Sequence, residues 1–221
     1  MFSKYAEKIL SYLIPFRIKN YKTKINGALE VNLINGKKTL DLPIGNFSYG
    51  ALQKILHKGL TEIRFNKDIQ TILVLGLGGG SIVETIREKF NSNAFIELVD
   101  IDSDMISIAI NEFEINKFQN INIVNADASN YFKNCHNSFD LIIVDIFILN
   151  VVPKKFTEPT FIKDLIIHLN PKGKIIYNTF RETMTDESLN GIKDEFFNNG
   201  LKTDIIEKVE STNDLIIAEK I

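Results

Sequence analysis

Apolar and polar positions follow two different patterns along this chain, and the change comes near residue 70. Before it, partly alternating runs are separated by two turn signals, Asn26-Gly27 and Asn35-Gly36. Asn-Gly between extended runs predicts a tight hairpin, because both central residues of a type I′ turn need positive φ. Residues 16–42 are therefore expected to form a small antiparallel meander. A loop at residues 43–50 then leads into a helix at residues 50–63.

From residue 70 onward, apolar runs alternate with segments of helical spacing. The runs show little polar alternation, which is typical of strands buried on both faces of a parallel sheet. The predicted strands cover residues 71–76, 94–100, 121–127, 139–145 and 173–179. The predicted helices between them cover residues 80–90, 103–115, 128–134 and 158–169. After a last helix at 186–200, two closely linked apolar runs predict an antiparallel hairpin at the sheet edge.

This order of elements predicts an α/β fold with a mostly parallel sheet and a C-terminal antiparallel hairpin. It resembles the class I methyltransferase-like (Rossmann-like) fold, and it differs from the NAD-binding fold, in which all strands run parallel. Two units are expected: residues 1–46, with an N-terminal helix and the small β-meander, and residues 47–221, with the α/β domain.

The first residues favour an amphipathic helix that ends at Pro15. The apolar side chains on its face are those of Phe2, Tyr5, Ile9, Leu10 and Leu13. We expect this face to dock on the chain's own domain or on a second subunit, so a homodimer is one expected assembly. Charged residues interrupt the run and no small-residue cleavage site follows, so a signal peptide is not expected.

The composition argues against nucleic acid and membranes as partners of this chain. The formal net charge of −2 leaves no electrostatic footprint for nucleic acid or an anionic membrane. No apolar run approaches the roughly 20 residues of a membrane span. The basic pairs Lys37-Lys38 and Lys154-Lys155 are expected to be solvated surface. These features indicate a cytoplasmic protein that acts on a small molecule.

Metal-binding and nucleophile patterns are missing from the sequence. The chain has one cysteine, Cys135, which excludes an internal disulfide and a thiolate metal cluster. The three histidines lie far apart without ligand spacing. We therefore expect no metal.

The carboxyl ends of the first four predicted strands carry residues suited to ligand binding, and ligands of doubly wound sheets lie at this edge. The first strand runs into a glycine cluster, and each of the next three ends at an aspartate. The candidate residues are Gly76, Gly78, Gly79, Gly80, Asp100, Asp127, Ala128 and Asp145. Together at one edge they indicate a binding site.

The spacing of these residues suggests an adenosine-containing ligand. Asp100 follows the glycine cluster by about 20 residues, where a carboxylate can accept hydrogen bonds from ribose hydroxyls. Asp127 can accept from the adenine amine, while the backbone amide beside it, at Ala128, serves a ring nitrogen. Asp102, just before a predicted helix, is interpreted as an N-cap.

A dinucleotide is the rival ligand. A dinucleotide loop has the pattern G-x-G-x-x-G, and Ser81 stands at the third glycine position here. A pyrophosphate gains from amides at a helix N-terminus, whereas S-adenosylmethionine has no phosphate and needs only close backbone approach. The loop therefore favours a sulfonium nucleoside.

The motifs resemble those of the spermidine synthase family, the polyamine aminopropyltransferases. The matching stretches read LVLGLGGGSIVETIREKF, IELVDIDSDMISIA, NADASNYF and FDLIIVDIF, with NFSYGALQKIL before them. The resemblance implies S-adenosylmethionine or its decarboxylated form as donor. It implies that Asp145 receives the proton of the attacking amine or orients it, and that Tyr49 closes over the acceptor site.

The chain also departs from that family. The second acid expected after the fourth strand is replaced by Ile148, the segment after the tyrosine reads Gly50-Ala51, and the hairpin glutamine corresponds to Thr39. A diamine acceptor would lose its partner. Methyl transfer to a small molecule and a non-catalytic nucleoside-binding module therefore stay open as alternatives, and a small NAD-dependent oxidoreductase is disfavoured.

Overall fold

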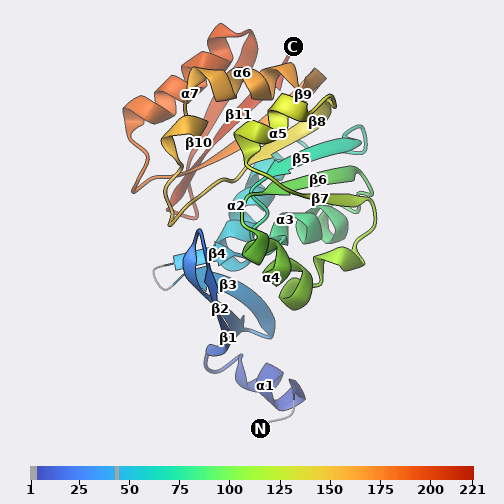
Figure 1. The fold of residues 1–221 in the computed structure, drawn as a ribbon, viewed down its shortest axis with the longest axis vertical. Coiled ribbons are helices and arrows are strands. Elements are labelled where there is room, and N and C mark those ends of the chain that lie inside the picture. The colour runs from blue at the N-terminus through green and yellow to red at the C-terminus, as the bar shows by residue number, and fades with distance from the viewer. Residues whose placement is uncertain (1–3, 43–44) are drawn as a thin grey trace.

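Two β-sheets organise the chain in a computed structural model that describes residues 4–42 and 45–221 (Figure 1). One sheet, here called the N-terminal sheet, has four strands in the order β1-β2-β3-β4. The other, the central sheet, has seven strands in the order β10-β11-β9-β8-β5-β6-β7. This confirms the α/β, class I methyltransferase-like fold expected from the sequence.

The N-terminal sheet is antiparallel throughout. Its strands are β1 (Phe16–Thr23), β2 (Gly27–Ile34), β3 (Lys37–Leu42) and β4 (Gly45–Ser48). Residues 43–50 were predicted to form a loop, and this was wrong for residues 45–48, which form the fourth strand. The hydrogen bonds that hold this Gly-containing segment as a strand come from its pairing with β3. Strand β4 also crosses the boundary between the two units that was expected at residues 46–47. Residues 43–44 of the predicted loop lie outside the described residues.

The two Asn-Gly turns differ. At Asn35-Gly36 both residues have positive φ, 49° and 75°, and Ile34 pairs with Lys37, so the predicted two-residue turn is confirmed. At the first turn Thr23 pairs with Gly27, which leaves a three-residue loop instead. The type I′ prediction was wrong there, because the loop is one residue longer and puts the positive φ on Gly27.

The central sheet has a parallel core with an antiparallel edge. Strands β5, β6, β7, β8 and β9 run parallel, β11 lies antiparallel to β9, and β10 antiparallel to β11, as expected. Their bounds are β5 (Thr71–Leu75), β6 (Phe95–Asp100), β7 (Ile121–Asn125), β8 (Phe139–Val144), β9 (Leu169–Phe180), β10 (Leu201–Val209) and β11 (Asn213–Lys220). The strand order reverses between β5 and β8, which places the switch point between the glycine cluster and Asp145.

Helices cover both faces of the central sheet (Figure 1). One core lies under α5, α6 and α7, and the other under α2, α3 and α4. The bounds are α1 (Lys4–Leu10), α2 (Gly50–Glu62), α3 (Ser81–Glu84), α4 (Ser103–Phe113), α5 (Ala128–Asn134), α6 (Pro159–Ile167) and α7 (Asp186–Asn198). The helix predicted at residues 80–90 continues from α3 as a π-helical segment, Thr85–Lys89.

Helix α1 stands at the far end of the N-terminal sheet (Figure 1). Its C-terminal end is attached to the second hairpin turn, where Asn35 N donates to the Ser11 carbonyl at 3.0 Å and Gly36 N to Ser11 Oγ at 2.8 Å. Ile9 and Leu13 of the predicted apolar face are more than half exposed, and Phe2 lies outside the described residues. Docking on a second subunit stays a prediction. Within the described chain, no helix is long and apolar enough to cross a membrane.

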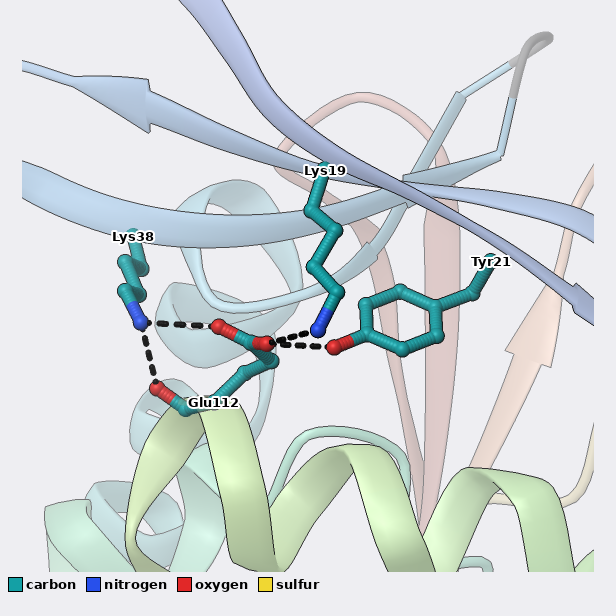
Figure 2. A network of polar contacts seen from close by, with 4 residues as sticks. All are labelled: Lys19, Tyr21, Lys38 and Glu112. Carbon is teal, nitrogen blue, oxygen red and sulfur yellow. Dashed lines mark hydrogen bonds and ion pairs between the residues drawn. The ribbon is translucent and has the colours of Figure 1, made fainter.

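A polar network attaches the N-terminal sheet to α4 (Figure 2). The Glu112 carboxylate accepts hydrogen bonds from Lys19 at 3.1 Å, from Lys38 at 2.9 Å and from the Tyr21 hydroxyl. Burial opposes ionisation of Glu112, but these donors outweigh it and lower its pKa to about 2. Lys38 is therefore a structural partner of Glu112, although its side chain stays partly exposed.

We expect Glu112→Gln to lower the free energy of unfolding by about 1–3 kcal/mol at pH 7, because it weakens hydrogen bonds to a charged acceptor. A carboxylate whose pKa is lower in the folded state stabilises the protein above its unfolded pKa, so this contribution is complete above about 4.5 and is lost as pH falls toward about 2. Denaturant unfolding at pH 7 and pH 3 measures both effects, and exposed Glu114→Gln is the control. An equal deficit at both pH values would contradict the assignment.

Candidate active site

A cavity of about 540 Å³ lies at the carboxyl edge of the central sheet. Its wall includes the ends of β5, β6 and β8, the loop after β7, the N-terminal turns of α2, and Ile25 and Asn26 from the first hairpin loop. Six of the predicted site residues line it: Gly76, Gly78, Asp100, Asp127, Ala128 and Asp145. The four strand ends singled out in the sequence therefore meet around one space.

Asp145 lies directly after β8, where its backbone N donates to the Leu75 carbonyl at 2.8 Å. Its Oδ1 accepts a hydrogen bond from Asn178 Nδ2 at 2.8 Å, and Asn178 is in turn held by Asn213 at 2.9 Å. Burial raises the pKa of Asp145 to about 6; the bond from Asn178 opposes this, and the negative charge of Asp100 adds to it. A carboxylate with that pKa can take up a proton near neutral pH.

The glycine cluster is required by close packing at several points. An added Cβ at Gly76, where φ is 95°, would lie 2.1 Å from the Asp145 carbonyl oxygen. At Gly80, with φ 83°, it would lie 2.4 Å from the Ile115 side chain, and at Gly79 3.0 Å from Ser48 Oγ. Gly79 and Gly80 thus pack against protein and are not among the cavity-lining residues, whereas Gly76 and Gly78 are.

Asp100 organises the loop next to the cavity. Its Oδ2 accepts from Leu77 N at 2.9 Å and its Oδ1 from Asp102 N at 2.8 Å. Burial raises the pKa of Asp100 in spite of these amides. Asp102 is the N-cap of α4, as expected: its Oδ1 accepts from Asp104 N at 3.0 Å and from Met105 N at 3.4 Å.

Asp127 has a double role that the sequence did not show. Its Oδ1 caps α5 by accepting from Ser129 N at 3.0 Å and Asn130 N at 3.2 Å, and its Oδ2 is paired with Lys155. Burial opposes ionisation of Asp127, but Lys155 and the amides outweigh it and hold its pKa below the ordinary value. Lys155 is half exposed, as expected of a surface lysine, but it also lines the cavity.

The loop after β8 gives the cavity an apolar wall. Ile146, Phe147, Ile148 and Leu149 line it, and the loop closes on itself through paired backbone bonds between Ile148 and Val151. Thr183 Oγ1 donates to the Asn150 carbonyl at 2.8 Å and ties this loop to the turn after β9. From that turn an exposed acid, Glu182, also reaches the wall.

Tyr49 is not among the residues that line the cavity. Its ring is 7% exposed and stacks on Phe113 of α4, with centroids 4.7 Å apart. It belongs to the core cluster between the N-terminal sheet and α4, and burial raises its pKa. The structure thus gives Tyr49 a packing position outside the set of residues that line the cavity with Asp145.

Sequence reasoning missed several polar lining residues, among them Asn26, Lys155 and Glu182. Asn26 was interpreted only as a turn residue and Lys155 only as half of a basic pair. Nothing in the local pattern around Glu182 signals a site, because tertiary folding brings its turn to the β8 loop.

The charges of the lining residues distinguish a cationic ligand from a ligand that contains a pyrophosphate. Four lining residues carry carboxylates, Asp100, Asp127, Asp145 and Glu182, against one lysine, Lys155. Such a surface attracts a cationic ligand and repels a pyrophosphate. At the dinucleotide position, Ser81 is 3% exposed and packed in the core. Both features disfavour a dinucleotide.

Sequence relatives divide between two reactions. The chain is 28% identical over 149 residues to a polyamine aminopropyltransferase of Vibrio vulnificus, covering 63% of this chain and 48% of that protein. It is 26% identical over 202 residues to an eEF1A lysine and N-terminal methyltransferase homolog of Drosophila melanogaster, covering 82% and 30%. The chain therefore spans less than half the length of each of these relatives.

Solved structures share the fold. A spermidine synthase in complex with the transition state analogue AdoDATO superposes with a TM-score of 0.64 at 14% identity, covering 93% of this chain and 72% of the other. Human methyltransferase-like protein 13 in complex with SAH gives 0.57 at 22% identity, covering 77% and 79%. The model of the spermine/spermidine synthase domain matches residues 52–202. The chain belongs to the spermine/spermidine synthase domain family.

Proposed function

We propose that this chain transfers an aminopropyl group from decarboxylated S-adenosylmethionine to an amine. The observation that carries the proposal is the cavity in which Asp100, Asp127 and Asp145 converge beside Gly76 and Gly78. Asp100 would bind the ribose, Asp127 and the Ala128 amide the adenine, and the glycines would allow the sulfonium nucleoside to lie against the backbone.

The wall charges favour the decarboxylated donor. Among the described lining residues the one cation is Lys155, and it is already paired with Asp127. The carboxylate of intact S-adenosylmethionine would therefore meet acids without a free cationic partner. The sulfonium, by contrast, gains from nearby carboxylates.

In the proposed reaction a neutral amine attacks the aminopropyl carbon bonded to the sulfonium. A nitrogen–carbon bond forms, the carbon–sulfur bond breaks, and its electron pair goes to sulfur, which becomes neutral. The nitrogen loses a proton to the Asp145 carboxylate. General-base help of this kind contributes about 10²–10⁴-fold to a rate.

Methyl transfer is the second candidate, and the apolar β8 loop is the observation that favours it. Ile148 stands where the family resemblance leads us to expect a second acid, so the far cation of a diamine lacks that partner. Glu182 offers a carboxylate at the exposed rim instead. An uncharged acceptor body would fit the Ile146–Leu149 wall better than a diamine would.

We expect calorimetry to detect binding of 5′-methylthioadenosine, weaker binding of S-adenosylhomocysteine because it carries the amino-acid carboxylate, and none of NADH. With decarboxylated S-adenosylmethionine and a panel of mono- and diamines, mass spectrometry should find 5′-methylthioadenosine as the nucleoside product. Formation of S-adenosylhomocysteine from S-adenosylmethionine would instead support methyl transfer. Binding of neither nucleoside would overturn the proposal.

A further inference from the structure

Asn26 holds a buried acceptor that the fold leaves unpaired. The residue is 5% exposed, and its Oδ1 has no hydrogen-bond partner within the described chain. An unsatisfied buried group of this kind costs about 1–3 kcal/mol, and most buried polar atoms are paired. The other such atom in the described residues, Arg87 Nε, belongs to a guanidinium that already donates to the backbone carbonyls of Ser92 and Ala94.

The neighbours of Asn26 fix the orientation of its amide. Nδ2 donates to Asp102 Oδ2 at 3.3 Å, and the other Asp102 oxygen caps α4. An ionised carboxylate only accepts hydrogen bonds, so the amide nitrogen must face Asp102. Oδ1 is therefore the free atom.

Turn geometry does not account for an asparagine at this position. Asn26 is the last residue of the three-residue loop, and the positive φ falls on Gly27 at 69°. Asn35, in the next turn, does have a positive φ of 49°, which asparagine tolerates well. The side chain of Asn26 thus serves a contact outside its own turn.

The residue itself lies at the cavity. Asn26 lines the wall together with Asp100, and the two are linked through Asp102, whose backbone N donates to Asp100 Oδ1 at 2.8 Å. Thr39, which the resemblance places at the hairpin glutamine, is directed elsewhere: its hydroxyl donates to Asp41 Oδ2 at 2.6 Å. Asn26 is therefore a separate polar group that the N-terminal sheet brings to the Asp100 side of the site.

We propose that Asn26 Oδ1 accepts a hydrogen bond from a ribose hydroxyl of the bound nucleoside, beside Asp100. This rests on the proposed function, because it assumes an adenosine-type ligand in the cavity. The hydroxyl supplies the donor that Oδ1 lacks. The N-terminal sheet then completes the donor site, and the network at Glu112 helps to hold it in register with α4.

Calorimetry with 5′-methylthioadenosine and its 2′-deoxy and 3′-deoxy analogues tests this. We expect Asn26→Ala to bind 5′-methylthioadenosine about five- to tenfold more weakly than the wild type. The wild type should bind one of the two deoxy analogues more weakly than 5′-methylthioadenosine, by a similar factor. Asn26→Ala should bind that analogue with the same affinity as the wild type does. Such non-additivity identifies the paired groups.

Asn35→Ala is the matched control in the same sheet. Alanine at a φ of 49° strains that turn and weakens the sheet, but affinity should stay within twofold of the wild type. Equal affinity of Asn26→Ala and the wild type overturns the proposal. So does an equal loss for every analogue, which would show a structural role. A wild type that binds no nucleoside overturns the proposed function itself. Where Asn26→Ala folds poorly, the smaller polar change Asn26→Ser, which also removes Oδ1, goes through the same analogue series with the same outcomes.

Discussion

Asp145→Asn is expected to lower turnover by about 10²–10⁴-fold while leaving nucleoside affinity within a few-fold of the wild type. The substitution removes the proton acceptor but keeps the size of the side chain. Asn178, whose Nδ2 donates to Asp145 Oδ1 at 2.8 Å, can still hydrogen-bond to the new amide oxygen. Single-turnover product formation and calorimetry measure the two quantities separately.

The pH profile gives this assignment a second readout. Because burial raises the pKa of Asp145 to about 6, the proton-accepting form is lost as pH falls through that value. The ratio kcat/KM should therefore show an acidic limb near pH 6, which the residual activity of Asp145→Asn lacks.

Asp140→Asn is the control on the same strand. Asp140 lies near the start of β8, where its carboxylate accepts from Thr71 N at 2.9 Å and from Asn170 Nδ2 at 2.7 Å, outside the cavity wall. This variant should lose stability and keep turnover. Full turnover in Asp145→Asn would remove Asp145 from the mechanism.

Gly76→Ala is expected to lower the free energy of unfolding by about 2–5 kcal/mol, the sum of overpacking and left-handed backbone strain. The new Cβ would lie 2.1 Å from the Asp145 carbonyl oxygen, and that atom is backbone, so the ends of β5 and β8 must move apart. For a chain of this size each kcal/mol lowers Tm by roughly 2–4 °C. Thermal and urea unfolding measure the loss, and nucleoside binding should fall with it.

Gly191→Ala is the matched control. Gly191 lies within α7, and a Cβ there meets no atom within 4 Å. Alanine in a helix interior should stabilise the chain by about 0.5–1 kcal/mol. A Gly76→Ala protein with wild-type Tm would contradict the close approach of the two strand ends.

Periodicity was enough to predict the central sheet. Uninterrupted apolar strands such as residues 71–76 and 139–145 need burial on both faces, and that need restricts them to a parallel sheet between helices. The edge hairpin followed from the short link between the last two runs. Strand β4 could not be predicted this way, because its pairing depends on the neighbouring β3 and not on its own composition.

The strand-end residues of the site could also be predicted from the sequence, because they follow from the parallel arrangement of the strands. Parallel strands bring their carboxyl ends to one edge of the sheet. A parallel sheet therefore places four residues at the same edge: Gly76, Asp100, Asp127 and Asp145. The helix-capping role of Asp127 and its pairing with Lys155 were not visible, since they depend on where the loop before α6 returns to the sheet.

The sequence by itself determined the sheet and the edge of it at which a ligand would lie, because both follow from local periodicity and chain direction. Tertiary structure decided which residues face that edge. It drew Tyr49 into a stack on Phe113, gave Gly79 and Gly80 packing partners, and brought Asn26 and Glu182 from distant loops to the cavity wall. Those positions depend on how separate elements pack against one another, which no local pattern encodes.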